Sequence, residues 1–174
     1  MILYHGTNTD FDRIDFRKCK PNKDFGRGFY LTDIKQQAIE MAVRRTSFEE
    51  KGSPVVQEYE FDESLLSSKD LKVKIFKGIS KEWAEFIIAN RKAKGKRVHD
   101  FDIVIGPIAD DSVVFQINLF MLHFITIEEI VKELYPMIKA MKSTVGDVVV
   151  IDGYHIIALS CGSKLSVITL MNDT

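Results

Sequence analysis

The alternation of apolar and polar positions predicts an irregular series of short strands and helices. Short apolar runs and two-residue alternation predict strands at residues 2–5, 29–32, 55–61, 101–105, 148–151 and 154–159. Asp152-Gly153 separates the last two strands, and this dipeptide is typical of a two-residue hairpin turn. Strands and helices follow one another without regular alternation, which favours an α+β fold over a wound parallel sheet. We expect residues 1–174 to form a single domain.

Helical spacing predicts a first helix that begins after Thr32 or Asp33, either of which can serve as its cap. Its buried face is expected to consist of Ala38, Met41 and Ala42. The apolar run at 113–127 is expected to be buried as well, with Gln116 in a strand.

Capping residues predict two more helices. Ser80 is expected to cap a helix over 80–91, in which the apolar positions fall on one stripe. Thr126 is expected to begin another, with Glu129 three residues later as the partner in a capping box.

Composition and charge are those of an ordinary folded domain. Of the 174 residues, 45% are hydrophobic and 28% are charged, which argues against disorder. The formal net charge of -1 gives no global attraction to nucleic acid or to a membrane. The basic run 91–97 is either a solvated segment or a contact for phosphates. No apolar stretch is long enough to span a bilayer, and no signal peptide is evident, so we expect a cytoplasmic protein. Cys19 and Cys161 lie far apart in the sequence, and we expect both thiols to be free.

Two segments are more specific than the rest of the chain. The first is His5-Gly6-Thr7 at the end of the first strand, and the second is Gly26-Arg27-Gly28 with Tyr30 two residues later. Alone, each is weak: a histidine at a strand end is common, and the glycine pair lacks the third glycine of a dinucleotide fingerprint.

Together these segments resemble the nicotinamide-binding parts of the ADP-ribosyltransferase superfamily, in the branch shared by diphtheria toxin and the poly(ADP-ribose) polymerases. The chain also resembles an uncharacterised bacterial family assigned to ADP-ribosyltransferase toxins, which are often paired with small antitoxins. That resemblance runs through Gln37-Ala38, Glu82-Trp83, Phe86-Ile87, Asn90-Arg91 and residues 101–111. It is clear for about residues 1–125 and poor after about 133.

The resemblance implies split antiparallel β-sheets with flanking helices and NAD as a substrate. It also implies a protein or nucleic-acid acceptor and an antitoxin as a possible partner. His5 would then bond a ribose hydroxyl, the backbone of Gly6 would clamp the nicotinamide carboxamide, and Thr7 would face the adenosine ribose. Tyr30 would stack on the nicotinamide ring.

The glycine pair and its neighbours have further implied roles. Gly26 and Gly28 would allow the backbone to approach NAD, and Arg27 would pair with the pyrophosphate or remain an exposed arginine. Met41 occupies the position of a second aromatic in the polymerase branch. It lies either against the nicotinamide ring or in the helix core.

The late catalytic position of the superfamily is the main departure. A glutamate, or a glutamine in the toxin-like family, is expected there, but this chain places Gly153. Asp152 and Gln116 are the candidate substitutes. Asp110 and Asp111 form either a structural turn or an edge of the site, and no His or Cys cluster supports a metal there.

Two other functions remain open. One is a catalytically impaired domain that binds NAD or a partner, which Gly153 and Met41 suggest. The other is an NAD-dependent RNA 2′-phosphotransferase, which also carries a His-Gly-Thr segment but needs several arginines to hold a phosphate. The arginines available for that role are Arg44, Arg45, Arg91 and Arg97.

Overall fold

The architecture is α+β. The computed structural model describes residues 1–108, 111–133, 155–160 and 168–170. The strands are β1 (Ile2–Thr7), β2 (Gly28–Thr32), β3 (Val55–Phe61), β4 (Val73–Ile75), β5 (Ile103–Pro107), β6 (His155–Ser160) and β7 (Ile168–Leu170). The α-helices are α1 (Lys35–Glu49), α2 (Lys81–Arg91) and α3 (Asp111–Met121), and the 3-10 helices are η1 (Phe16–Lys18) and η2 (Glu63–Ser67). A further helical segment covers 127–133.

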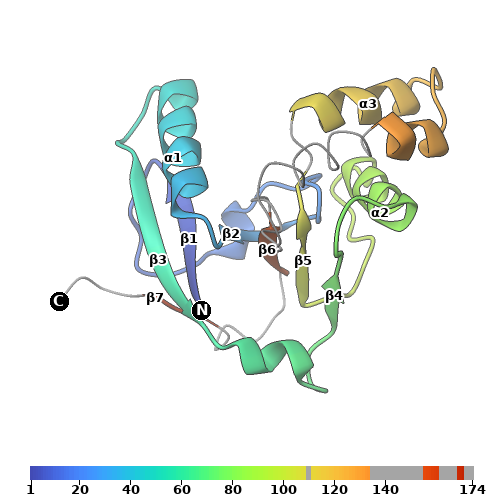
Figure 1. The fold of residues 1–174 in the computed structure, drawn as a ribbon. Coiled ribbons are helices and arrows are strands. Elements are labelled where there is room, and N and C mark those ends of the chain that lie inside the picture. Colours follow the sequence, from blue (N-terminus) through green and yellow to red (C-terminus); the bar gives the residue numbers. More distant parts are fainter. Residues whose placement is uncertain (109–110, 134–154, 161–167, 171–174) are drawn as a thin grey trace, which may run out of the picture.

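The strands form one sheet in the order β4-β5-β6-β2-β1-β3-β7. All neighbouring strands are antiparallel except β4 and β5, which run parallel. Figure 1 shows α1 alongside β1 and β3 at one end of the sheet, and α2 and α3 together at the other end.

The sheet is weakly joined between β1 and β2. β1 pairs with β3 along its whole length, but it pairs with β2 only at Tyr4 and Thr32. If that register continued, Gly6 would face Tyr30, yet the strands separate before this position. We call the place between Gly6 and Tyr30 the β1–β2 break. It divides the sheet into one half with β1, β3 and β7 and another with β2, β6, β5 and β4.

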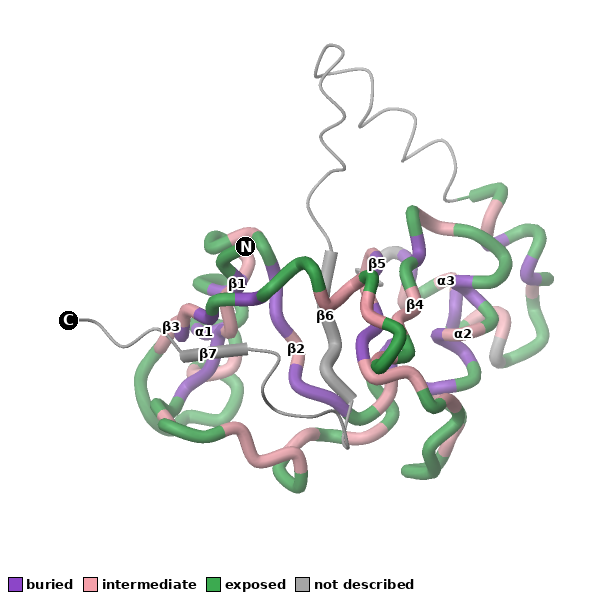
Figure 2. The backbone as a smooth tube through the Cα atoms, turned by 90° about the horizontal axis from the view of Figure 1, so that it is seen from below, coloured by how far each residue is buried: buried purple, intermediate pink, exposed green. Residues whose placement is uncertain are grey.

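Two apolar clusters fill the two sides of the sheet. Phe29 and Leu31 belong to one cluster, with Leu3 and Phe61, whereas Tyr30 packs against the other, around Trp83 of α2. This alternation follows from the two-residue repeat of a strand. Figure 2 marks the buried residues along β1, β2 and β5.

Several predicted elements are confirmed. Ser80 caps α2, where its Oγ accepts a hydrogen bond from Trp83 N at 3.2 Å. Thr126 and Glu129 form the capping box, with distances of 2.6 and 3.2 Å between the partners. Strand β3 spans the predicted range 55–61, and Gln57, Tyr59 and Phe61, which share one of its faces, are buried.

Other predictions were wrong. The run after residue 110 forms helix α3 instead of a strand. Of the α3 side chains that the structure describes, the buried ones are Val113 and Ile117, four residues apart as on one face of a helix. Phe115 and Phe124 are exposed, so the run 113–127 is not buried throughout. Asp111 begins α3 rather than ending a turn.

The first helix and the sheet also differ from expectation. The N-cap of α1 is Ile34, which supplies no side-chain hydrogen bond, so neither Thr32 nor Asp33 caps it. Thr32 instead donates from its Oγ1 to Gln37 Oε1 at 2.8 Å. Strand β4 was not predicted, because three residues are too few to show a pattern. Residues 148–154, with the predicted hairpin, lie outside the described residues.

Candidate functional site

The free edge of β1 at the β1–β2 break is presented by Gly6. Met1 and Phe61 exchange two hydrogen bonds, of 2.7 Å and 2.9 Å, so this pair marks the hydrogen-bonded register between β1 and β3. In an antiparallel ladder such pairs alternate, so Leu3, His5 and Thr7 also bond β3. The N–H and C=O of Tyr4 and Gly6 therefore point towards β2. Those of Gly6, a buried residue, lie beyond the last β1–β2 pair.

The Cα of Gly6 lies against helix α1. A Cβ at this position would be 2.0 Å from the backbone oxygen of Ala38 and 2.9 Å from Ala42 N. Ala38 and Ala42 are themselves buried, since only small side chains fit where the helix crosses the strand so closely. A glycine is thus required here by packing, independently of any ligand.

His5 joins the two halves of the sheet. Its Nδ1 lies 2.8 Å from Tyr30 O, and because a carbonyl oxygen can only accept, Nδ1 carries the proton. Its ring lies 4.3 Å from that of Phe29 and 6.0 Å from that of Phe11, measured between centroids. Burial lowers the pKa of His5 to about 4, assisted by the charge of Arg45 and opposed by the hydrogen bond to Tyr30. Near neutral pH the ring is therefore uncharged, and its Nε2 is a hydrogen-bond acceptor.

The Nε2 atom of His5 is free to accept from a ligand. It has no hydrogen-bond partner among the described residues. It is also in contact with solvent. In the described residues, the one side-chain nitrogen or oxygen that is fully buried and has no partner is His99 Nδ1, so His5 Nε2, which has no partner, is not fully buried.

The lowered pKa of His5 predicts a stability that depends on pH. The unfolded chain binds a proton on this histidine near its ordinary pKa of 6.5, whereas the folded chain does so only near pH 4. The free energy of unfolding should therefore decrease as the pH falls through this window, by up to roughly 3 kcal/mol from His5. Urea unfolding across the window would measure this loss. His5→Asn should show a smaller loss, since the carboxylates contribute equally to both proteins, and an identical loss in the variant would contradict the assignment.

Tyr30 presents a partly exposed ring on the other face of β2. The ring is stacked on Phe25, with centroids 6.4 Å apart and planes inclined by 12°. Its hydroxyl donates to Gly26 O at 2.8 Å and accepts from Phe25 N at 3.0 Å. Burial raises the pKa of Tyr30, so the hydroxyl remains protonated and keeps donating to Gly26.

The loop that leads into β2 is held by the region at and after the end of α2. Arg91 pairs with Asp24 at 2.6 Å and 2.7 Å, and His99 Nε2 bonds Phe25 O at 3.0 Å. Gly26 has φ of +83°, and a Cβ there would be 2.8 Å from Asn90 Oδ1. Sequence reasoning did not find this anchoring role, although Asn90-Arg91 belongs to the segments that carry the family resemblance.

Met41 lies at the surface, so its interpretation as a core residue was wrong. Its side chain is 46% exposed, and the buried face of α1 consists of Ala38 and Ala42. Four residues before Met41, on the same side of the helix, Gln37 bonds Thr32 of β2. Met41 therefore lies on the edge of α1 that faces β2.

The other predicted site residues are not all brought together. Thr7 is buried, and its hydroxyl oxygen accepts from Thr9 N at 3.4 Å. Gly28 is buried at the start of β2, and Arg27 is exposed with a long contact of 3.5 Å to Arg17 O. Gln116 lies in α3, which Figures 1 and 2 place at the α2 end of the sheet, away from β1.

Asp152 and Gly153, at the late catalytic position, lie outside the described residues. So does Asp110, which was predicted to form a turn or an edge of the site. Among the residues that are described, no three His, Cys, Asp or Glu side chains converge as metal ligands would.

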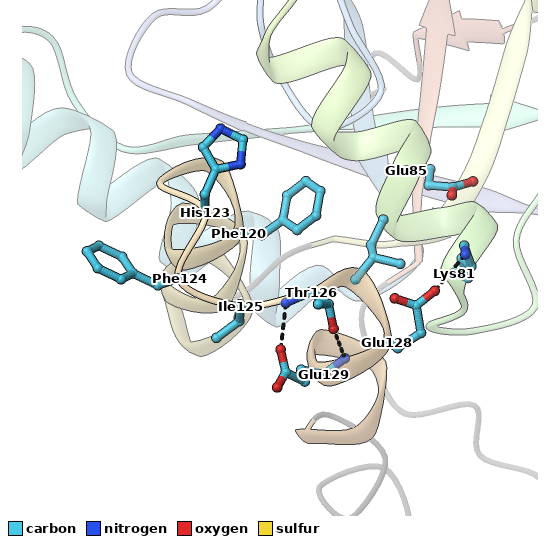
Figure 3. A pocket seen from close by; sticks show the side chains of 10 residues that line it. Lys81, Glu85, Phe120, His123, Phe124, Ile125, Thr126, Glu128 and Glu129 are labelled. Atoms are coloured by element: carbon cyan, nitrogen blue, oxygen red, sulfur yellow. Dashed lines mark hydrogen bonds and ion pairs between the residues drawn. The ribbon is translucent and has the colours of Figure 1, made fainter.

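A shallow hollow of about 480 Å³ lies elsewhere, between α2 and the segment after α3 (Figure 3). Two of its three acidic side chains are already engaged: Glu128 pairs with Lys81 at 2.6 Å, and Glu129 bonds the backbone of Thr126, which leaves Glu85 alone. The hollow therefore offers no convergent set of free polar groups, and the β1–β2 break remains the better candidate site.

No helix in the described ranges is both long and apolar enough to cross a membrane. Cys19 forms no disulfide, and Cys161 falls outside those ranges.

Comparison with known proteins places the chain in a family but assigns it no activity. No curated protein and no solved structure matches it. One family model, described as a protein of unknown function, matches residues 1–144, which is most of the chain. The protein therefore belongs to the DUF3990 family.

Proposed function

We propose that this protein is an NAD-dependent ADP-ribosyltransferase of the toxin type, with the split-sheet fold of that superfamily and with NAD bound at the β1–β2 break. One observation carries the proposal: His5 Nδ1 bonds Tyr30 O across the break, where the β1–β2 pairing has ended before Gly6. The groups that we assign to NAD recognition are the acceptor nitrogen of neutral His5, the backbone of Gly6 and the ring of Tyr30.

These groups match the chemistry of the nicotinamide end of NAD. The nicotinamide carboxamide presents an NH2 donor and a carbonyl acceptor side by side, and these are complementary to the C=O and N–H of Gly6, so the two can form paired hydrogen bonds. His5 Nε2 can accept from a ribose hydroxyl, and a flat heterocycle gains about 1 kcal/mol from an aromatic neighbour such as Tyr30. Met41, on the β2-facing edge of α1, is a second group able to contact the ring.

The reaction itself needs positioning more than covalent participation. The bond between nicotinamide and C1 of the ribose breaks, and nicotinamide leaves with the electron pair. An acceptor nucleophile then bonds to C1 and loses its proton. Positive charge develops on the ribose, so rigid binding and a nearby oxygen group promote the step. Asp152 is our candidate for that group.

An RNA 2′-phosphotransferase needs several arginines that are free to hold a phosphate. Two of the four candidates are engaged, since Arg91 is paired with Asp24 and Arg45 is paired with Glu49 at 3.2 Å. This pairing supports ADP-ribosylation over 2′-phosphotransfer to NAD. Within the same proposal, the acceptor is a protein or a nucleic acid, the site of action is the cytoplasm, and a small antitoxin is the neutralising partner.

The decisive measurement is nicotinamide release from NAD by the purified chain, together with a thermal-shift titration of NAD. In His5→Asn the new amide can still donate to Tyr30 O, but the acceptor Nε2 is lost. We expect a stable protein with NAD consumption reduced about tenfold or more, the cost of one hydrogen bond. Tyr30→Leu should cause a comparable loss by removing the stacking ring.

His123→Asn is the matched control for this experiment. His123 is exposed with φ of +63°, a conformation that asparagine tolerates, and it lies in the hollow of Figure 3. Consumption should be unchanged in this variant. Equal consumption by all the variants would refute the assigned site, and stabilisation by NAD without turnover would identify a domain that only binds NAD.

A further inference from the structure

Two basic segments of the chain are almost free of acidic residues. The first covers residues 17–27, where the one acidic residue is Asp24, and the second covers 92–97, where there is none. Their cationic residues are Arg17, Lys18, Lys20, Lys23, Arg27, Lys92, Lys94, Lys96 and Arg97, and all of these are exposed. The chain as a whole has a net charge of -1, so this concentration of positive charge is local.

Tertiary contacts bring the two segments together. Gly95 N donates to Asn22 Oδ1 at 2.8 Å, which joins the middle of one loop to the middle of the other. Asn22, Lys94 and Gly95 all have positive φ, so both loops turn sharply at this contact. The buried pair of Arg91 and Asp24 fixes the two loops a few residues away. We call the combined surface of 17–27 and 92–97 the basic surface.

Most charges of the basic surface are available to a ligand. Arg17 pairs with Asp15 at 2.9 Å, and Lys20 lies 3.9 Å from Glu49. The other cations of the surface form no ion pair with any described residue, although Lys92 lies over the ring of Phe120 and Arg97 donates to His99 O. Asp24 does not neutralise them, because its carboxylate is already paired with Arg91.

The basic surface adjoins the start of β2. Its first segment ends at Arg27, and β2 begins at the next residue. The hydroxyl of Tyr30 is bonded to Gly26 O within that segment. A polymer held on the surface would therefore lie next to the loop that leads into the candidate site.

We infer that the basic surface binds the phosphate backbone of a nucleic acid, and that a nucleic acid is the acceptor of the reaction proposed above. The second statement rests on the proposed function, whereas the first does not. Protein interfaces have apolar or aromatic centres, but no large apolar side chain is exposed in either segment. Contacts to a phosphate backbone need only cations and hydrogen-bond donors, which is what this surface offers.

The test compares two charge-reversed variants of the full chain. Lys23→Glu/Lys94→Glu/Lys96→Glu alters the basic surface. Lys69→Glu/Lys77→Glu/Lys132→Glu makes the same change of net charge at exposed lysines outside it. Fluorescence anisotropy with a labelled single-stranded RNA of about 20 nucleotides, and with a DNA duplex, measures binding without NAD over a range of salt concentrations.

We expect the first variant to bind at least about tenfold more weakly than the wild type. For the single strand, the slope of log affinity against log salt should become shallower by about 2, because each phosphate contact contributes about 0.7. The control variant should bind like the wild type. Equal losses of affinity in both variants would overturn the inference. So would a competition experiment in which polyglutamate displaces the labelled nucleic acid as well as RNA does.

The acceptor is identified in a separate arm with labelled NAD. The basic-surface variant should consume NAD like the wild type when no acceptor is present, but it should transfer less label to RNA or DNA. Label that appears on protein alone would overturn the acceptor assignment and leave the binding result intact. Failure of the proposed function would show as absent NAD consumption in the wild type, which the binding assay does not involve.

Discussion

Gly6→Ala is expected to lower the free energy of unfolding by about 3 to 4 kcal/mol and to abolish NAD binding. The added Cβ would lie 2.0 Å from Ala38 O, and the obstacle is helix backbone instead of a flexible side chain. Helix α1 must therefore move away from β1, which separates Ala38 and Ala42 from the strand. Urea unfolding measures the first effect, and a thermal-shift titration with NAD measures the second.

Gly78→Ala provides the control for this prediction. A Cβ at Gly78 would meet no atom within 4 Å, and its backbone does not have positive φ. Its stability should change by less than about 0.5 kcal/mol. If Gly6→Ala were equally harmless, the close packing of α1 on β1 would be wrong, and with it the geometry of the β1–β2 break.

Arg91→Ala is expected to destabilise the fold by about 2 to 4 kcal/mol, because it leaves a buried carboxylate without its charge partner. The exposed fractions of the two side chains are 20% for Arg91 and 11% for Asp24. The variant should also weaken NAD binding, since the loop held by this pair supplies the hydrogen-bond partners of the Tyr30 hydroxyl. Chemical denaturation and NAD titration measure the two consequences.

Arg17→Ala is the matched control for Arg91→Ala. It removes an arginine–aspartate pair of similar geometry, but the Arg17 side chain is 90% exposed. Such exposed pairs are screened by water and contribute little to stability, so the free energy of unfolding should hardly change. Equal effects of the two variants would show that the Asp24 pair does not anchor the loop.

The elements with strong local signals could be predicted from the sequence. Ser80 before α2 and the capping box of Thr126 and Glu129 act within one turn of helix, so neighbouring residues are enough to specify them. The alternation in β3 is equally local. The segment of α3 was wrongly predicted as a strand. In a run with many apolar residues, the sequence does not show whether the buried positions repeat every two residues, as in a strand, or every three to four, as in a helix.

The sequence by itself determined the candidate site residues: the His5-Gly6-Thr7 and Gly26-Arg27-Gly28 segments, with Tyr30, stand out without any structure. Only the tertiary structure decided how they are arranged. It placed His5 Nδ1 on Tyr30 O, ended the β1–β2 pairing before Gly6, and joined the loop at Asn22 to the loop at Gly95. These contacts link residues far apart in the chain. Their formation depends on how whole strands and helices pack, which no local pattern of residues encodes.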